Sequence, residues 1–139
     1  MTSRTPLLIV DAMNVIGTRP DGWWRDPNAA KCRLVGRLQR LAAARPERIE
    51  VVIDGRPVRE MPAGEYDGVL VRYTGHSAPN AADDQIVALV SARPEDVTVV
   101  TSDRELRRRV EALGARVEGA TWLLDLIDQA EHPGHLPEP

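Results

Sequence analysis

The sequence contains one cysteine, one lysine, no phenylalanine and no long hydrophobic run. Because Cys32 is the only cysteine among 139 residues, an internal disulfide bond and a cysteine-based zinc site are excluded. No apolar run approaches the roughly 20 residues that a membrane-spanning helix needs, and the first residues lack the apolar stretch of a signal peptide. We therefore expect a protein of the reducing cytoplasm that has no membrane partner.

The charged side chains nearly balance, with 18 basic and 21 acidic residues and a formal net charge of −3. A domain that coats nucleic acid through bulk charge is usually clearly basic, so this composition disfavours that class of protein. It does not exclude an enzyme that handles a phosphate chain locally. Lys31 is the only lysine, so any mechanism that needs a catalytic lysine has a single candidate.

The hydrophobic pattern predicts strands that alternate with helices. Short runs of β-branched residues, typical of strands buried on both faces, occupy residues 7–10, 49–53, 69–73 and 97–100, with a weaker run at 115–117. Apolar residues at helical spacing mark 29–44, 82–92, 106–113 and 122–130, and Gly114 is placed to end the third helix. The Gly- and Pro-rich segment 55–67 is expected to be a loop.

This alternation predicts an α/β fold: a three-layer α/β/α sandwich with a mostly parallel central sheet. The length suits one domain, and a hydrophobic content of 42% suffices for a core. We expect the domain to span residues 1–131 and residues 132–139 to form a flexible tail.

Carboxylates follow the ends of the predicted strands. Asp11, Asp54 and Asp103 each lie at or just past the end of a strand, and Asp83 and Asp84 open the helix after the fourth strand run. In open α/β sheets the carboxyl ends of the strands form the edge where ligands bind. The sequence therefore predicts a cluster of carboxylates in a small volume at this edge.

Each aspartate also has a purely structural interpretation. Asp83 and Asp103 suit helix N-caps, Asp84 suits a first helical turn, and Asp11 and Asp54 suit turns after strands. Jointly these interpretations are less convincing, because gathered like charges repel one another unless a cation neutralises them. Lysine is almost absent, and ligands made only of oxygen favour Mg²⁺ or Mn²⁺. Such ions can activate water and stabilise the leaving oxygen of a phosphodiester.

Polar residues near these carboxylates are candidates for substrate positioning. The amide of Asn14 could orient a water or a phosphate, and the hydroxyls of Thr101 and Ser102 could do the same or satisfy backbone groups at the strand end. Arginines expected at the rim could contact a phosphate backbone or be solvated surface residues; they are Arg56, Arg59 and Arg104. Trp23 and Trp24 are candidates for stacking on unpaired bases or for core packing.

Other α/β site classes lack their motifs in this chain. The turn after the first strand holds neither the Gly-Lys-Ser/Thr of a phosphate-binding P-loop nor the GxGxxG of a dinucleotide site, so no nucleotide cofactor is expected. Phosphoaspartate phosphatases and receiver domains share the acidic strand end but carry a late lysine, and Lys31 lies too early in the chain.

Four segments taken in order resemble the YacP-like branch of NYN domains, within the PIN-like nuclease superfamily: 10–17 (VDAMNVIG), 52–54 (VID), 82–86 (ADDQI) and 100–104 (VTSDR). The resemblance implies a PIN-like α/β/α fold and a metal-dependent ribonuclease whose active site is a carboxylate cluster. Carried over by position, the matching family residues are Asp11, Asn14, Asp54, Asp83, Asp84 and Asp103. Asn80 departs from the pattern, since relatives often carry a glutamate there.

The sequence therefore predicts a Mg²⁺- or Mn²⁺-dependent endoribonuclease that hydrolyses single-stranded RNA, in a ribosome or RNA-processing context. The predicted catalytic residues are Asp11, Asp54, Asp83 and Asp103, and the predicted metal ligands are Asp11, Asp83, Asp84 and Asp103. The alternative, motivated by Asn80, is a non-catalytic RNA- or ribosome-binding module with an impaired metal site. A metal-dependent phosphatase acting on small esters is a third option.

Overall fold

The computed structural model describes residues 6–76, 78 and 80–132 and contains a six-stranded sheet of order β3-β4-β2-β1-β5-β6. Each neighbouring pair is parallel except the antiparallel pair β3 and β4. The strands are β1 (Leu7–Asp11), β2 (Arg48–Ile53), β3 (Gly64–Tyr66), β4 (Val69–Tyr73), β5 (Val97–Val100) and β6 (Arg116–Glu118).

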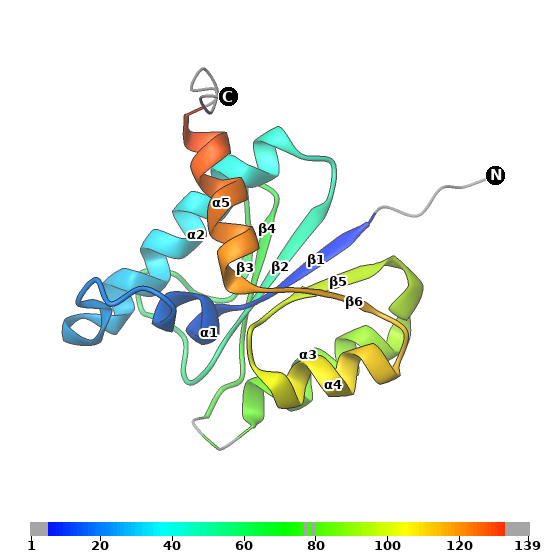
Figure 1. Ribbon diagram of the computed structural model, residues 1–139. Helices are drawn as coiled ribbons and strands as arrows, with labels where there is room; N and C mark the ends of the chain where they lie inside the picture. The colour runs from blue at the N-terminus through cyan, green and yellow to red at the C-terminus, as the bar shows by residue number, and fades with distance from the viewer. Residues whose placement is uncertain (1–5, 77, 79, 133–139) are drawn as a thin grey trace.

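Helices cover both faces of the sheet, as Figure 1 shows. The α-helices are α1 (Ala12–Gly17), α2 (Pro27–Ala44), α3 (Ala81–Ala92), α4 (Arg104–Ala112) and α5 (Ala120–Glu131). Two short 3₁₀ helices are η1 (Trp23–Arg25) and η2 (Pro94–Asp96). Helices α2 and α5 cover one face, α3 and α4 cover the other, and α1 continues directly from the end of β1. The three-layer α/β/α sandwich expected from the sequence is confirmed.

The central strand β1 explains why the sequence pattern does not alternate. Leu8 and Val10 pack in the core beneath α2 and α5, whereas Leu7 and Ile9 pack in the core beneath α3 and α4. All five residues of β1 are buried. Because both faces of a central parallel strand meet helices, apolar residues are required at every position.

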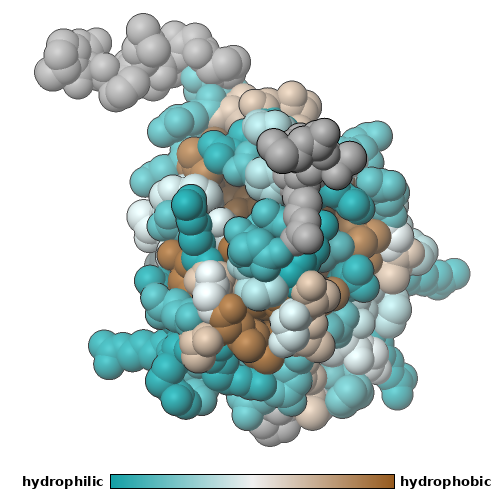
Figure 2. Space-filling model, turned by 90° about the vertical axis from the view of Figure 1, so that its right-hand side faces the viewer, coloured by the Kyte–Doolittle hydropathy of each residue, from teal (hydrophilic) through white to brown (hydrophobic). Residues whose placement is uncertain are grey.

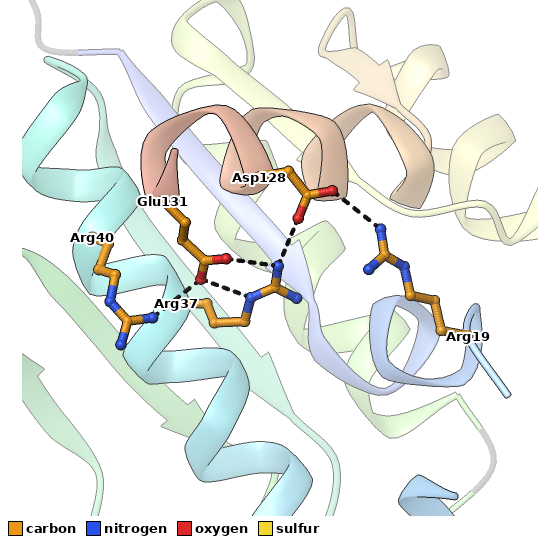
Figure 3. Close-up of polar contacts among 5 residues, drawn as sticks. All are labelled: Arg19, Arg37, Arg40, Asp128 and Glu131. Carbon is orange, nitrogen blue, oxygen red and sulfur yellow. Dashed lines mark hydrogen bonds and ion pairs between the residues drawn. The ribbon is translucent and has the colours of Figure 1, made fainter. Parts of the chain in front are cut away.

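Polar side chains join α5 to α2 and to the segment that follows α1 (Figure 3). Arg37 of α2 donates to Glu131 at 2.9 Å and to Asp128 at 2.8 Å, both on α5. Arg40 also donates to Glu131, and Arg19 lies 3.5 Å from Asp128. The hydrogen bond from Arg37 is the main cause of the lowered pKa of Glu131. This network fixes α5 against α2 at the rim of the core.

The expected strands and helices are present, and the structure adds α1 where only a turn was expected after the first strand. Two further corrections follow. The segment 55–67, expected to be a loop, contains β3, which forms a hairpin with β4 through Asp67 and Gly68. Both turn residues have positive φ, 47° and 90°, as a type I′ turn requires, and Asp-Gly is a typical sequence for it. The second correction concerns α3, whose N-cap is Asn80, so that Asp83 lies in the first turn and does not cap the helix.

The outer surface shown in Figure 2 carries hydrophobic side chains only in small areas between hydrophilic ones. Across the described ranges, the structure has no helix both long and apolar enough to cross a membrane. Residues 133–139 of the expected tail lie outside the described residues.

The order of the strands reverses beside β1. From β1 the chain continues to β2 and β4 on one side, and it then crosses to β5 on the other side. Ligands of open α/β sheets bind at such a switch point, in the crevice outside the carboxyl ends of the strands. The ends of β1 and β5 are therefore where a site is expected, and Asp11 and Asp103 lie there.

Candidate functional site

Asp11 is the last residue of β1 and is only 6% exposed. Its Oδ2 accepts a hydrogen bond from the Thr101 hydroxyl at 2.9 Å. Burial is the main cause that raises the pKa of Asp11 from 3.8 to about 6, against the lowering effect of the Thr101 hydrogen bond. The negative charges of Asp83 and Asp103 raise it further. The fold thus holds the Asp11 carboxylate in buried, acidic surroundings that disfavour its charged form.

Thr101 connects Asp11 to Asp103 across the switch point. This threonine is fully buried, and its hydroxyl oxygen also accepts a hydrogen bond from the Asp103 backbone N–H at 3.1 Å. Asp103 in turn caps α4, because its Oδ1 accepts from the Leu106 N–H at 3.0 Å. The helix cap considered from the sequence is therefore confirmed, and the same residue lies beside Asp11.

Asn14 and Ser102 hold the loops around Asp11 together. The Asn14 Oδ1 accepts a hydrogen bond from the Ser102 N–H at 2.8 Å, which ties α1 to the end of β5. The Ser102 hydroxyl accepts from the Ala120 N–H at 3.1 Å at the start of α5. Of the two roles that the sequence left open for Ser102, the structure shows the satisfaction of a backbone group.

Asp83 and Asp84 bring α3 into the same acidic region. The pKa of Asp83 is raised, first by burial and then by Asp103, with smaller contributions from Asp84 and Asp54. Asp84 is exposed and forms an ion pair with Arg109 of α4 at 3.0 Å. The sequence placed Arg109 near the site, more as a solvated surface residue than as a phosphate contact, and did not predict this ion pair, because no local pattern reveals which arginine of α4 reaches α3.

Asp54 follows β2 on the other side of Asp11. The Thr74 hydroxyl, just after β4, lies 3.3 Å from its Oδ1 and accepts a hydrogen bond from the Gly55 N–H at 2.8 Å. Thr74 was not expected from the sequence, although its place at the end of a parallel strand would have indicated it. The structure therefore brings Asp54 within electrostatic reach of Asp83.

The expected rim residues are exposed. Arg56 and Arg59 lie on the loop after β2, and Arg104 is the first residue of α4. Asn80 is exposed and has a φ of 66°, in the left-handed region that asparagine tolerates better than most residues. An asparagine at this position thus suits the backbone that introduces α3.

The donor set of this cluster is chemically suited to a hard divalent cation. Its side chains offer carboxylate oxygens, and the pKa values of Asp11 and Asp83 are raised mainly by burial and further by neighbouring carboxylates, both of which a bound cation would offset. In their present side-chain conformations, no three His, Cys, Asp or Glu residues of the described ranges are arranged to hold a metal ion. Asp84 and Asp103 instead meet Arg109 and the α4 backbone.

The sequence matches a known family model, and the fold is similar to solved structures. The chain matches the family model of the YacP-like NYN domain over residues 8–135. A mutant of Rae1 (YacP) from Bacillus subtilis has a similar crystal structure, with a TM-score of 0.75, 24% identity, and coverage of 93% of this chain and 79% of that one. A second Rae1 (YacP) structure from the same organism gives a TM-score of 0.71, 23% identity, and coverage of 91% and 76%. No curated protein sequence is significantly similar. The structures confirm the expected PIN-like fold.

Proposed function

The chain belongs to the YacP-like NYN domain family, and from this premise we propose that it is a metal-dependent endoribonuclease that hydrolyses phosphodiester bonds of single-stranded RNA. Family membership supports a nuclease-like, RNA-related function. The observation that carries the finer proposal is the buried Asp11 at the switch point of the sheet, which Thr101 links to Asp103 and whose pKa the charges of Asp83 and Asp103 raise. Three further points stay predictions: that the protein acts in the cytoplasm, on the ribosome, or during RNA processing.

Three aspartates would hold the cation. Asp11 and Asp103 come from the ends of β1 and β5, Asp83 comes from α3, and Asp84 would join them by leaving Arg109. When bound, Mg²⁺ or Mn²⁺ supplies the positive charge that makes water more acidic and stabilises the leaving oxygen of the phosphodiester. Asp54, held beside Thr74, is the carboxylate that we assign to take up the proton of the attacking water.

The remaining polar residues position the strand and the carboxylates. Thr101 fixes the orientation of Asp11, and Asn14 holds the β5–α4 loop. The exposed arginines after β2 and at the start of α4 are suited to contact backbone phosphates on either side of the cluster; they are Arg56, Arg59 and Arg104.

Cleavage of an end-labelled single-stranded RNA in the presence of Mn²⁺ tests the proposal. Asp11→Asn and Asp103→Asn should each reduce the rate at least about 100-fold, since electrostatic groups of active sites commonly contribute that much. Asp125→Asn, on the exposed side of α5, is the matched control and should cleave at the wild-type rate. Unchanged circular dichroism spectra would show that the variants are folded. Undiminished cleavage by both site variants would contradict the proposal.

A non-catalytic RNA-binding module is the second candidate, and Asn80 and the ion pair of Asp84 with Arg109 favour it. Calorimetric titration with Mn²⁺ separates the two functions. Binding of Mn²⁺ by the wild type and its loss in Asp11→Asn would support the nuclease. Binding of RNA without any binding of Mn²⁺ would support the module.

A further inference from the structure

A small pocket lies beside the carboxylate edge, between the end of α1, η1, the first half of α2 and α5. Its polar lining consists of Arg19, Arg33, Arg37 and Asp21, and Trp23 contributes an aromatic wall. The cavity volume is about 50 Å³. A buried water needs about 10–15 Å³, and pockets that enclose small molecules have about 300–1,000 Å³. The pocket therefore has room for a compact polar group and is too small for a nucleobase.

The charges around the pocket are suited to an anion. The lining holds three guanidinium groups and one carboxylate, but Arg37 is already paired with Glu131 and Asp128 of α5 (Figure 3). Arg19 and Arg33 are therefore the guanidinium groups that can turn to a bound anion. The Arg19 side chain is 46% exposed and lies 3.5 Å from Asp128, so it is only loosely held. Among the described residues, Arg33 has no ion-pair partner. Guanidinium groups bind phosphate oxygens through paired hydrogen bonds, so a phosphate group suits both the size and the charge of this pocket.

An exposed aromatic ring stands next to the pocket. Trp24 is 53% exposed and is one of two large hydrophobic residues in the described ranges with such exposure, the other being Leu113. Its ring meets that of Trp23 edge to face, with centroids 6.2 Å apart, and the Arg25 guanidinium lies 6.0 Å from its centroid. Since exposed indoles held in place are platforms for unpaired bases, Trp24 offers a stacking surface beside the pocket.

Helix α1 connects this pocket to the carboxylates. It begins immediately after Asp11, and Val15 and Ile16 in its second turn line the pocket. With a helical rise of 1.5 Å per residue, these two positions lie roughly 6–8 Å along the axis from Asp11. A nucleic-acid strand that enters the carboxylate cluster can therefore reach the pocket within a few nucleotides.

We propose that the pocket binds a backbone phosphate of single-stranded RNA through Arg19 and Arg33, and that Trp24 stacks on an adjacent unpaired base. The inference rests on the proposed ribonuclease function, because it concerns the same RNA strand at a second position. It also assigns different roles to the two neighbouring tryptophans. Trp23 forms the wall of the pocket and supports Trp24, and Trp24 contacts the substrate.

Cleavage kinetics over a range of RNA concentrations test this subsite. Trp24→Ala should raise the half-saturating concentration of a short single-stranded RNA by about 5- to 100-fold, as expected for the loss of one stacked base. The rate at saturating RNA should be unchanged, and Trp24→Tyr should restore most of the affinity. Leu113→Ala, which removes the other exposed apolar side chain, is the matched control and should behave as the wild type.

The salt dependence of binding tests the phosphate contact separately. For a fluorescein-labelled single-stranded RNA in EDTA, Arg33→Ala should lower the slope of log K against log salt concentration by about 0.7, the value for one phosphate contact on a single strand. Arg116→Ala, at the exposed start of β6 on the opposite edge of the sheet, should leave the slope unchanged. Inorganic phosphate should compete only weakly, because it offers no base to Trp24.

The outcomes separate this inference from the function on which it rests. If the wild type neither binds nor cleaves single-stranded RNA, the proposed function is contradicted and the subsite falls with it. If the wild type cleaves RNA while Trp24→Ala and Arg33→Ala keep wild-type half-saturation and salt slope, only the subsite is overturned. Full competition by inorganic phosphate, together with no effect of Trp24→Ala, would indicate a site for free anions and would overturn the assignment to RNA.

Discussion

At the scale of single residues, the buried Asp11 carries a carboxylate whose ionised form destabilises the folded protein. The folded-state pKa of about 6 exceeds the ordinary value of 3.8, so the folded protein binds the proton more tightly than the unfolded chain does. Ionisation of Asp11 therefore opposes folding. The free energy of unfolding is lowered progressively as the pH rises from about 4 through about 6. The loss of stability reaches about 3 kcal/mol at neutral pH.

Replacement of this carboxylate should accordingly stabilise the metal-free protein. We expect Asp11→Asn to exceed the wild type in free energy of unfolding by up to about 3 kcal/mol at pH 7, with the difference shrinking towards zero near pH 4. The asparagine Oδ1 can still accept the hydrogen bond of Thr101. Urea denaturation in EDTA at several pH values measures this difference. A gain that does not vary with pH, or a loss of stability at pH 7, would contradict the interpretation.

At the scale of elements, the hairpin of β3 and β4 closes the edge of the sheet beyond β2. Its Asp67-Gly68 turn needs positive φ at both residues, and the Gly68 backbone also lies against α2. A Cβ atom at Gly68 would lie 3.1 Å from the Cβ of Ala42. The hairpin was missed from the sequence because the surrounding Gly and Pro residues indicated a loop, although Asp-Gly before an apolar run is itself a hairpin signal.

Two glycine-to-alanine substitutions should have opposite effects on stability. Gly68→Ala should destabilise the fold by roughly 1–3 kcal/mol, because it combines an unfavourable positive φ with a close contact. Gly36→Ala is the matched control within α2, where nothing lies within 4 Å of an added Cβ, and it should stabilise the fold by about 0.5–1 kcal/mol. Thermal or urea unfolding of both variants checks the signs. A neutral Gly68→Ala would show that the turn does not need glycine.

At the scale of the whole molecule, the distribution of charge matters more than the net charge of −3. The fold brings Asp11, Asp83 and Asp103 to one edge of the sheet, where Asp83 and Asp103 raise the pKa of Asp11 and Asp103 raises the pKa of Asp83. Arginines lie around this edge, on the loop after β2, on α4 and in the pocket beside α1. A modest negative total is therefore compatible with binding of a nucleic-acid strand, because a bound cation would neutralise the acidic centre.

The sequence predicted the edge of the sheet at which the carboxylates lie, because residues that follow parallel strands come to the same edge; that these carboxylates form the site stays a prediction. Asp11 and Asp103 follow neighbouring strands, and this relation follows from the strand order alone. The partners of individual side chains could not be predicted. The ion pair of Asp84 with Arg109 and the hydrogen bond from the Ala120 N–H to Ser102 depend on how α3, α4 and α5 pack, which no local pattern encodes. The expected domain limits and site roles stay predictions.

The central claim is that the aspartates at the ends of β1 and β5 and in α3 hold a divalent cation. A crystal soaked in Mn²⁺, with anomalous scattering data recorded near the manganese edge, tests it most directly. We expect an anomalous peak coordinated by Asp11, Asp83 and Asp103, and no such peak in crystals of Asp11→Asn treated in the same way. Wild-type crystals that show no peak at these carboxylates, or a peak only at other acidic residues, would contradict the claim.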